Sequence, residues 1–360
     1  MRRARRTVGL LTLALLASCS SSSGTLEPPP GTDAGVDGSL PPPPKTATCT
    51  GSTSTCLLGT VSTSQFALAP TGTQVSLYDV YPYGAVTPVG RQPLAEDGTF
   101  AFSGLSVSVG TAYYIQAESV FGPGAAKMGN GVASVAGPFS LPSPASIAIQ
   151  MKPVFLEALQ QRPSGGGSTT LAWASGHVFD PATGAEVTDA TVSFSNGTKS
   201  WPMPYGKNAG GISSYYVAIE AGVAGGTAFT VTTGGGALKL PQKTWNLTGE
   251  PATFDGSVSS PSPGAAVPAH SPLTVTWVPA AGATYEVVQL FATQGTMQTP
   301  VFLSPAANAT TVMTETIPAS ALAAAGSYLL NVAYSNASCP PAADGCVYNN
   351  STVPVMFTAQ

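Results

Sequence analysis

The chain has 360 residues, a formal net charge of −4 and a hydrophobic content of 43%, enough apolar material for several packed cores. Only 8% of its residues are charged, against about 25% in typical soluble domains. Its 13 Lys and Arg form no basic patch, which excludes nucleic acid as an expected partner. Because 12 Tyr, 13 Phe and 4 Trp argue against a wholly disordered chain, the composition predicts an all-β protein with an uncharged, hydroxyl-rich surface.

The N-terminus begins with a short basic stretch that contains four arginines, Arg2, Arg3, Arg5 and Arg6. An apolar run over residues 7–17 follows, too short to span a bilayer as a stable helix, and small residues then precede Cys19. This arrangement resembles the lipobox of bacterial lipoproteins. The resemblance implies that residues 1–18 are a signal peptide and that Cys19 carries acyl chains such as palmitate. An ordinary secretory signal with a chance cysteine is the alternative.

Lipidation of Cys19 implies that the membrane is a partner through the N-terminal lipid and that the protein lies in the bacterial cell envelope. Ser20 follows the cysteine where Asp is linked with inner-membrane retention, so the resemblance implies the outer membrane. Cleavage removes four Arg and no acidic residue, which leaves 9 Lys and Arg against 17 Asp and Glu, a mature net charge of −8.

Residues 19–48 are expected to form a disordered tether. Serine fills positions 20–23 and proline fills positions 28–30 and 41–44, and such runs cannot build a core. Proline runs favour the polyproline II conformation at about 3.1 Å per residue, so the tether reaches roughly 90 Å when extended.

Residues 49–155 show the period-two alternation of half-buried strands, for example at Phe100 and Phe102. Asp97-Gly98 is a turn signal directly before that strand. The order of turns and strand faces resembles the carboxypeptidase-regulatory or transthyretin-like β-sandwich. The resemblance implies a non-catalytic accessory domain.

Residues 156–170 are expected to be a linker, with 154–161 either a short helical turn or an extension of the preceding strand. Residues 171–255 resemble a diverged repeat of the first sandwich, with an alternating strand over 190–194. The expected architecture is therefore a series of tandem β-sandwiches behind a tether.

Residues 256–360 form the last expected domain. Leu273, Val275 and Trp277 alternate along one predicted strand, and Tyr328 precedes another. This pattern resembles a fibronectin type III or immunoglobulin-like sandwich. The resemblance implies that Trp277 is the core tryptophan and that Tyr328 is the tyrosine-corner residue.

Four cysteines remain after Cys19, and they are Cys49, Cys56, Cys339 and Cys346. An exported chain meets an oxidising compartment, so disulfides are expected, and four cysteines allow three connectivities. Equal spacing of seven favours the local pairs, each of which stabilises the fold by roughly 2–3 kcal/mol. A zinc site is the rival, but neither His177 nor His270 lies near a cysteine in sequence, so no metal is expected.

The sequence contains no recognisable catalytic constellation. It lacks a Gly-x-Ser-x-Gly elbow, a P-loop and a dinucleotide fingerprint, and its two histidines, His177 and His270, belong to no metal or triad motif. The protein is therefore expected not to be an enzyme and to need no cofactor. An enzyme with an unfamiliar site is the least favoured alternative.

Four aromatic residues are the candidate ligand-binding side chains, namely Tyr81, Tyr83, Trp201 and Tyr205. Exposed rings on a sandwich stack on sugars or anchor a protein partner, whereas buried rings close the ends of a core. The preferred hypothesis is a non-enzymatic lipoprotein that binds a protein or glycan, mediates adhesion or has a structural role. The alternative is a carbohydrate-binding module on the envelope, which requires Trp201 and Tyr205 to be exposed and coplanar.

Overall fold

A computed structural model of the chain describes residues 42–67, 72–80, 88–107, 112–120, 131–142, 146–162, 167–207, 213–251, 254–295, 297–304, 307–308 and 313–360. The predicted signal peptide, Cys19 and most of the predicted tether lie outside these residues. The described chain is nearly all β, with strands β1–β24 and two short 3-10 helices, Thr53–Thr55 and Ala319–Leu322. None of its helices has the length and apolar character needed to cross a membrane. The predicted all-β class is confirmed.

The N-terminal lobe consists of two sheets, ordered β4-β1-β7 and β3-β2-β5-β6. Alternating residues such as Leu57, Val75, Phe100 and Ile115 fill the core between these sheets. The seven strands are β1 (Leu57–Ser62), β2 (Gln74–Tyr78), β3 (Gly90–Pro93), β4 (Thr99–Phe102), β5 (Tyr113–Val120), β6 (Gly131–Phe139) and β7 (Ile147–Gln150).

The middle lobe packs a sheet ordered β11-β10-β14-β15 against strands β12, β13, β9 and β8 of a larger sheet. Phe194, Trp201, Phe229 and Trp245 dominate its core. Its strands are β8 (Val154–Arg162), β9 (Thr170–Val178), β10 (Thr191–Ser195), β11 (Ser200–Pro202), β12 (Tyr205–Lys207), β13 (Ser213–Ala218), β14 (Ala228–Gly235) and β15 (Leu240–Thr248).

The predicted linker at 156–170 is wrong over its first half, because β8 extends through Arg162. Leu156 and Ala158 of β8 enter the core of the middle lobe, while Leu159 on the opposite face enters a second cluster. A strand that is buried on both faces cannot act as a flexible connector. The alternative that the segment forms a strand agrees with the structure.

The C-terminal lobe packs a sheet ordered β16-β18-β22 against strands β24, β23, β19 and β20 of the same larger sheet. Its strands are β16 (Ser257–Ser260), β17 (Ala266–Val267), β18 (Leu273–Val278), β19 (Tyr285–Gln294), β20 (Met297–Leu303), β21 (Ala307–Asn308), β22 (Thr314–Ile317), β23 (Gly326–Ser338) and β24 (Cys346–Ala359). Trp277 is buried in its core, as the resemblance implies. The Tyr328 hydroxyl donates to the Ala324 carbonyl at 2.8 Å, which is the backbone bond of a tyrosine corner.

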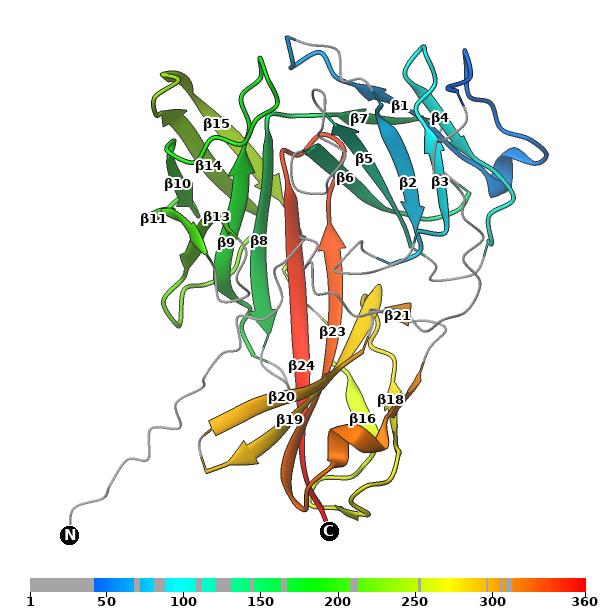
Figure 1. The fold of residues 1–360 in the computed structure, drawn as a ribbon, viewed down its shortest axis with the longest axis vertical. Helices are drawn as coiled ribbons and strands as arrows, with labels where there is room; N and C mark the ends of the chain where they lie inside the picture. Colours follow the sequence, from blue (N-terminus) through cyan, green and yellow to red (C-terminus); the bar gives the residue numbers. More distant parts are fainter. Residues whose placement is uncertain are drawn as a thin grey trace.

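A ten-stranded sheet joins the middle and C-terminal lobes, with a main path of β12-β13-β9-β8-β24-β23-β19-β20 (Figure 1). Strand β24 makes the joint, because its first half pairs in parallel with β8 while its whole length pairs with β23. The lobes therefore share backbone hydrogen bonds, which independent tandem domains do not.

The N-terminal lobe is fixed to this sheet by a buried cluster, called the junction core below. The junction core includes Tyr78 and Tyr114 from the N-terminal lobe, Trp173 from the middle lobe, and Tyr285 and Tyr348 from the C-terminal lobe. Tyr114 is fully buried, and its hydroxyl donates to the Ala337 carbonyl at 3.2 Å. Burial raises the pKa of Tyr114 to about 12. The three lobes thus pack as one unit.

The end of the predicted tether also differs from expectation. The Pro44 carbonyl accepts a bond of 2.9 Å from the backbone N–H of Glu96, and the Ala47 N–H donates to the Thr99 hydroxyl at 2.7 Å. The chain is therefore bound to the N-terminal lobe from residue 44 onwards, four residues before the predicted end of the tether.

Candidate functional site

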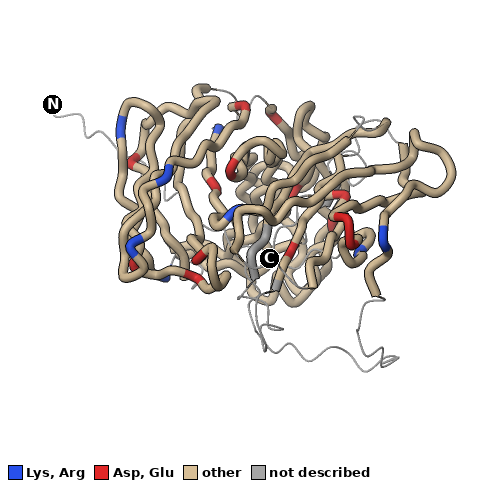
Figure 2. The backbone as a smooth tube through the Cα atoms, turned by 90° about the horizontal axis from the view of Figure 1, so that it is seen from above, with Lys and Arg blue, Asp and Glu red and all other residues tan. Residues whose placement is uncertain are grey.

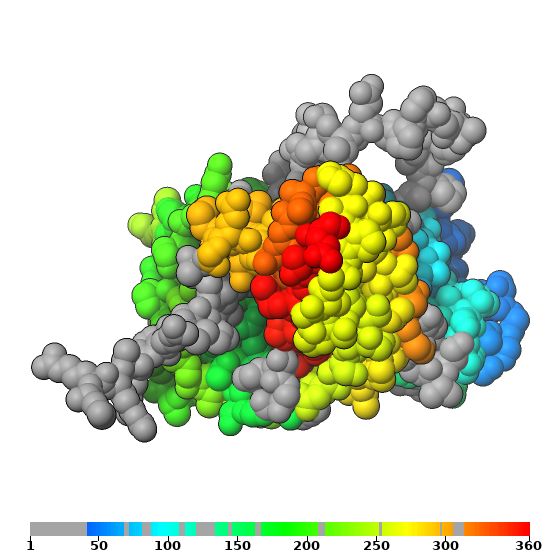
Figure 3. Space-filling model, turned by 90° about the horizontal axis from the view of Figure 1, so that it is seen from below, coloured from blue at the N-terminus to red at the C-terminus, as the bar shows by residue number. Residues whose placement is uncertain are grey.

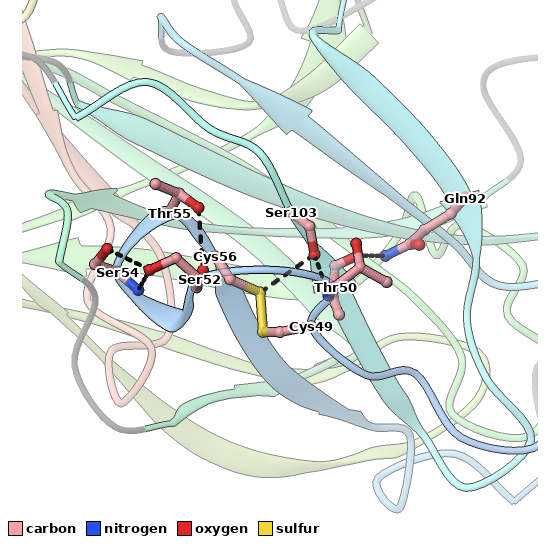
Figure 4. Close-up of a disulfide and its surroundings, with 9 residues drawn as sticks. Cys49, Thr50, Ser52, Ser54, Thr55, Cys56, Gln92 and Ser103 are labelled. Atoms are coloured by element: carbon pink, nitrogen blue, oxygen red, sulfur yellow. Dashed lines mark hydrogen bonds between the residues drawn. A yellow bond between two sulfur atoms is a disulfide. The ribbon is translucent and has the colours of Figure 1, made fainter.

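Both local disulfides form, as the equal spacing predicts. Cys49 and Cys56 pair with a Cα–Cα distance of 6.0 Å, and Cys339 and Cys346 pair with a distance of 4.4 Å. Beside the first disulfide, the Ser103 hydroxyl donates to Cys56 Sγ at 3.7 Å and accepts from the Thr50 N–H at 2.9 Å (Figure 4). The disulfide joins the segment around Cys49 to the residue directly before β1, and the Ser103 bonds connect this segment to the end of β4.

The second disulfide closes a loop that contacts all three lobes. Cys339 exchanges two backbone hydrogen bonds with Gly137 of β6, at 2.8 and 2.9 Å. Gly137 has a positive φ of 146°, and a Cβ there would lie 2.8 Å from the Tyr113 carbonyl oxygen, so the contact requires glycine. In the same loop, Asp344 forms an ion pair with Lys152 at 2.6 Å and accepts from the Asn246 N–H at 2.6 Å.

A small cavity beside this loop is lined by Lys152, Asp344 and residues of β6 and β8. Its volume is about 20 Å³, which holds roughly one water molecule. Ligand pockets for small molecules are larger, about 300–1,000 Å³. The loop is therefore a structural joint between the lobes.

The predicted aromatic platform is not formed by Trp201. Its ring is only 7% exposed and packs against Phe194 at a centroid distance of 5.9 Å. The indole N–H donates to Glu220 at 2.8 Å, which satisfies the ring's one polar group. Tyr205 is half-buried against Tyr215 in an edge-on arrangement. The expectation that Trp201 and Tyr205 stack on a sugar is therefore wrong, because Trp201 belongs to the core of the middle lobe and Tyr205 packs against that core.

The other two predicted aromatic residues, Tyr81 and Tyr83, lie outside the described residues. The nearby Tyr78 belongs to the junction core.

A small polar cluster surrounds His177 at the end of β9. Its Nδ1 lies 2.6 Å from a Glu186 oxygen, and its ring stacks on Phe179 with the planes 20° apart. Burial and, to a smaller extent, the adjacent Glu186 charge together raise the pKa of Tyr205 to about 12. No hydroxyl or thiol hydrogen-bonds to His177 among the described residues. These contacts hold the loop before β10 onto β9, and His177 is a strand residue, as predicted.

The described residues contain no group of three or more His, Cys, Asp or Glu side chains arranged to hold a metal ion. Glu286 of β19 is a buried carboxyl group with 1% exposure. Burial raises its pKa to about 7, although the Trp277 indole N–H donates to it at 2.7 Å. Because this carboxyl lies inside the C-terminal core, it does not face a ligand.

The C-terminal lobe presents the most distinctive surface of the described chain. Residues 256–360 contain no Lys or Arg, and their only acidic residues are Glu286, Glu315 and Asp344. Figure 2 shows how thinly charge is distributed over the backbone. Six of the ten exposed large hydrophobic side chains of the described residues nevertheless belong to this lobe: Val278, Met297, Val301, Leu303, Met313 and Met356.

Three of these side chains, Met297, Val301 and Leu303 of β20, define what we call the β20 surface. Strand β20 ends the main path of the ten-stranded sheet, and six of its seven residues are exposed, all except Phe302. Sequence analysis missed this surface. The lack of Lys and Arg in residues 256–360 can be seen in the sequence, but the exposure of the apolar side chains cannot.

No protein-family model matches the chain, and no curated protein is significantly similar to it. Among solved structures, the FN1–FN3 domains of chicken CNTN1 align over 80% of this chain and 89% of their own, with 9% identity and a TM-score of 0.24. Activated α2-macroglobulin of Escherichia coli aligns over 85% of this chain and 32% of its own, with 10% identity and a TM-score of 0.21. A tetra-tandem repeat of a large adhesion protein aligns over 83% and 74%, with 12% identity and a TM-score of 0.17. These scores are too low to carry a functional argument.

Proposed function

We propose that this protein is a non-enzymatic lipoprotein of the bacterial outer membrane, anchored through Cys19, with a binding or structural role for its β-sandwich lobes. The lipobox-like N-terminus supports the anchor. The absence of a metal-ligand cluster and of a hydroxyl or thiol bonded to His177 among the described residues supports a role without catalysis.

The β20 surface carries the binding part of the proposal. The described chain begins at residue 42 beside the N-terminal lobe, and the C-terminal lobe lies at the opposite end of the molecule (Figure 1). The tether is therefore attached at the N-terminal lobe, and the C-terminal lobe is the end of the molecule that lies farther from the attachment point. An exposed, uncharged and partly apolar surface at that end suits a protein partner, because contiguous exposed apolar patches mark interaction sites.

Glycan binding through Trp201 and Tyr205 is not part of the proposal, since Trp201 is buried. A protein partner fits the β20 surface better. Its exposed residues include no Trp or Tyr that could stack on a sugar ring.

The anchor is tested by metabolic labelling with a palmitate analogue. The wild-type chain is expected to take up label and to fractionate with the outer membrane, and Cys19→Ala is expected to lose both. Cys49→Ala is the matched control, because it removes a cysteine that lies outside the lipobox. An unlabelled wild-type chain in the soluble periplasmic fraction would refute the anchor.

Protease shaving of intact cells tests which side of the membrane the lobes face. Release of a fragment that begins after the tether would place the lobes outside the cell and support a role in adhesion. Complete protection until the outer membrane is opened would place them in the periplasm and direct the search for partners to envelope proteins.

A further inference from the structure

We propose that the β20 surface is a homotypic interface, in which β20 of one molecule lies antiparallel along β20 of a second copy. The ten-stranded sheet would then continue across a two-fold axis. This inference deepens the proposed function, which names the same surface as the binding site, and it identifies the partner as another molecule of this chain.

The first observation is the open sheet edge. Strand β20 pairs with β19 from Met297 to Leu303 and has no strand on its other side among the described residues. Figure 3 shows residues near position 300 at the surface, beside the C-terminal strand. An edge strand with free N–H and C=O groups is a template for another strand, since main-chain hydrogen bonds then supply the affinity.

The second observation is the lack of the charges that usually protect such an edge. Residues 287–314 contain no charged side chain, whereas natural edge strands commonly carry Lys. Two protective features are present, namely Pro300 and a register shift opposite Leu290 and Phe291. Pro300 removes one N–H donor from each copy, and the N–H groups of β20 that bond to β19 are not available to a second strand. Pairing therefore uses only the groups that point away from β19, and Pro300 shortens this ladder without abolishing it.

The third observation is that the charge distribution is compatible with a second copy as the partner. A two-fold axis brings a surface against itself, so any charge on that surface meets its own sign. The mature chain carries a net charge of −8, yet 14 of its 17 acidic residues lie before residue 256. In the C-terminal lobe Glu286 is buried and Asp344 is paired with Lys152. Two copies can therefore meet through β20 with less like-charge repulsion than through either other lobe.

The opposite end of the sheet does not offer the same contact. Strand β12 has three residues, Tyr205–Lys207, and includes a lysine. Two copies paired through β12 would bring these lysines close together and would form few ladder bonds. This sheet therefore extends at β20, and pairing there leaves the ten-stranded sheet with no second long edge at the ends of its main path.

The test uses the mature chain from residue 19 with Cys19→Ser, so that lipid cannot drive association. Light scattering after size exclusion, over a wide concentration range, is expected to show a dimer. Leu303→Lys is expected to weaken dimerisation by more than about tenfold, because it places charge on the joined edges. Leu238→Lys in the middle lobe is the matched control, since Leu238 and Leu303 are both 54% exposed, and it is expected to dimerise like the wild type.

Amide hydrogen exchange supplies a second readout that does not depend on any variant. Protection of the N–H groups of 297–303 is expected to rise with protein concentration, while protection of 205–207 stays constant. Equal melting temperatures for Leu303→Lys and the wild type would show that the variant is folded.

Four results would overturn the inference: a wild-type chain that stays monomeric at all concentrations, equal dimerisation of Leu303→Lys and wild type, larger open-ended assemblies, or a monomer whose β20 surface binds phosphatidylcholine vesicles. The last result would assign the surface to lipid. Failure of dimerisation with intact palmitate labelling would refute the homotypic contact alone, whereas loss of labelling with intact dimerisation would refute the proposed anchor alone.

Discussion

Glu286→Gln is expected to remove the loss of stability that the Glu286 carboxyl causes as the pH rises. The Glu286 carboxyl is 1% exposed, one of its oxygens accepts from the Trp277 indole at 2.7 Å, and the other has no hydrogen-bond partner among the described residues. Burial raises the pKa of this carboxyl to about 7 from an ordinary value of 4.5. Tyr334, whose pKa is raised by burial and by the Glu286 charge, is the other titratable group beside it.

The sign of the effect follows from proton binding. Below pH 4.5 the carboxyl is protonated in both the folded and the unfolded chain, so the stability is fully present. As the pH rises to about 7, the unfolded chain loses its proton first, and the free energy of unfolding falls by about 1.4 kcal/mol per pH unit. The total loss is therefore about 3 kcal/mol, and it is complete above the folded pKa.

Glutamine keeps an acceptor for Trp277 but does not ionise, and its buried amide N–H₂ costs roughly 1 kcal/mol without a partner. The variant is thus expected to be less stable than wild type by roughly 1 kcal/mol at about pH 4, and more stable by about 2 kcal/mol at about pH 8. Urea unfolding followed by tryptophan fluorescence at a series of pH values measures both differences. Glu315→Gln on β22 is the control, and it is expected to leave the profile unchanged. Parallel pH profiles for wild type and Glu286→Gln would refute the reasoning.

Three further substitutions test other parts of the structure by the same denaturation assay. Tyr328→Phe removes the hydroxyl bond to Ala324 and is expected to cost about 1 kcal/mol; no loss would mean that the tyrosine corner is not formed. Lys152→Met leaves the largely buried Asp344 without its ion-pair partner and is expected to cost about 3 kcal/mol, with Lys152→Arg retaining part of that stability. Trp201→Ala is expected to cost about 3–5 kcal/mol because it empties a core position, whereas an unchanged stability with a loss of glycan binding would restore the platform hypothesis.

Local features were predictable because they depend on residues close together in sequence. The spacing of seven between Cys339 and Cys346 suits a local disulfide across the end of a hairpin, and the structure pairs them. The alternation of Leu273, Val275 and Trp277 places these side chains on one face of β18, and all three are buried. Their period of two is a property of the extended backbone and needs no tertiary information.

The candidate site was less predictable, because burial is not encoded by residue type alone. Trp201 in a Pro-rich segment resembles an exposed loop aromatic, yet Phe194 and Glu220 give it an apolar neighbour and a hydrogen-bond acceptor in the core. Leu303, which sequence analysis did not single out, is exposed because it lies on an edge strand. The arrangement of the strands therefore decides that Trp201 is buried and that Leu303 is exposed.

The sequence by itself determined the all-β class, the strand faces within each lobe, the local disulfides and the scarcity of charge. Only the tertiary structure decided that the lobes form one unit. Strand β8 pairs in parallel with β24, and the Tyr348 hydroxyl on β24 donates to Glu157 on β8, 191 residues away in sequence. A hydrophobic strand pattern specifies that a strand must be covered by a core and paired with a neighbour. It does not specify which neighbour, because many strands of this chain could pair with β8 equally well. The choice among them rests on the packed interior that all three lobes build together, and that interior exists only once the chain is folded.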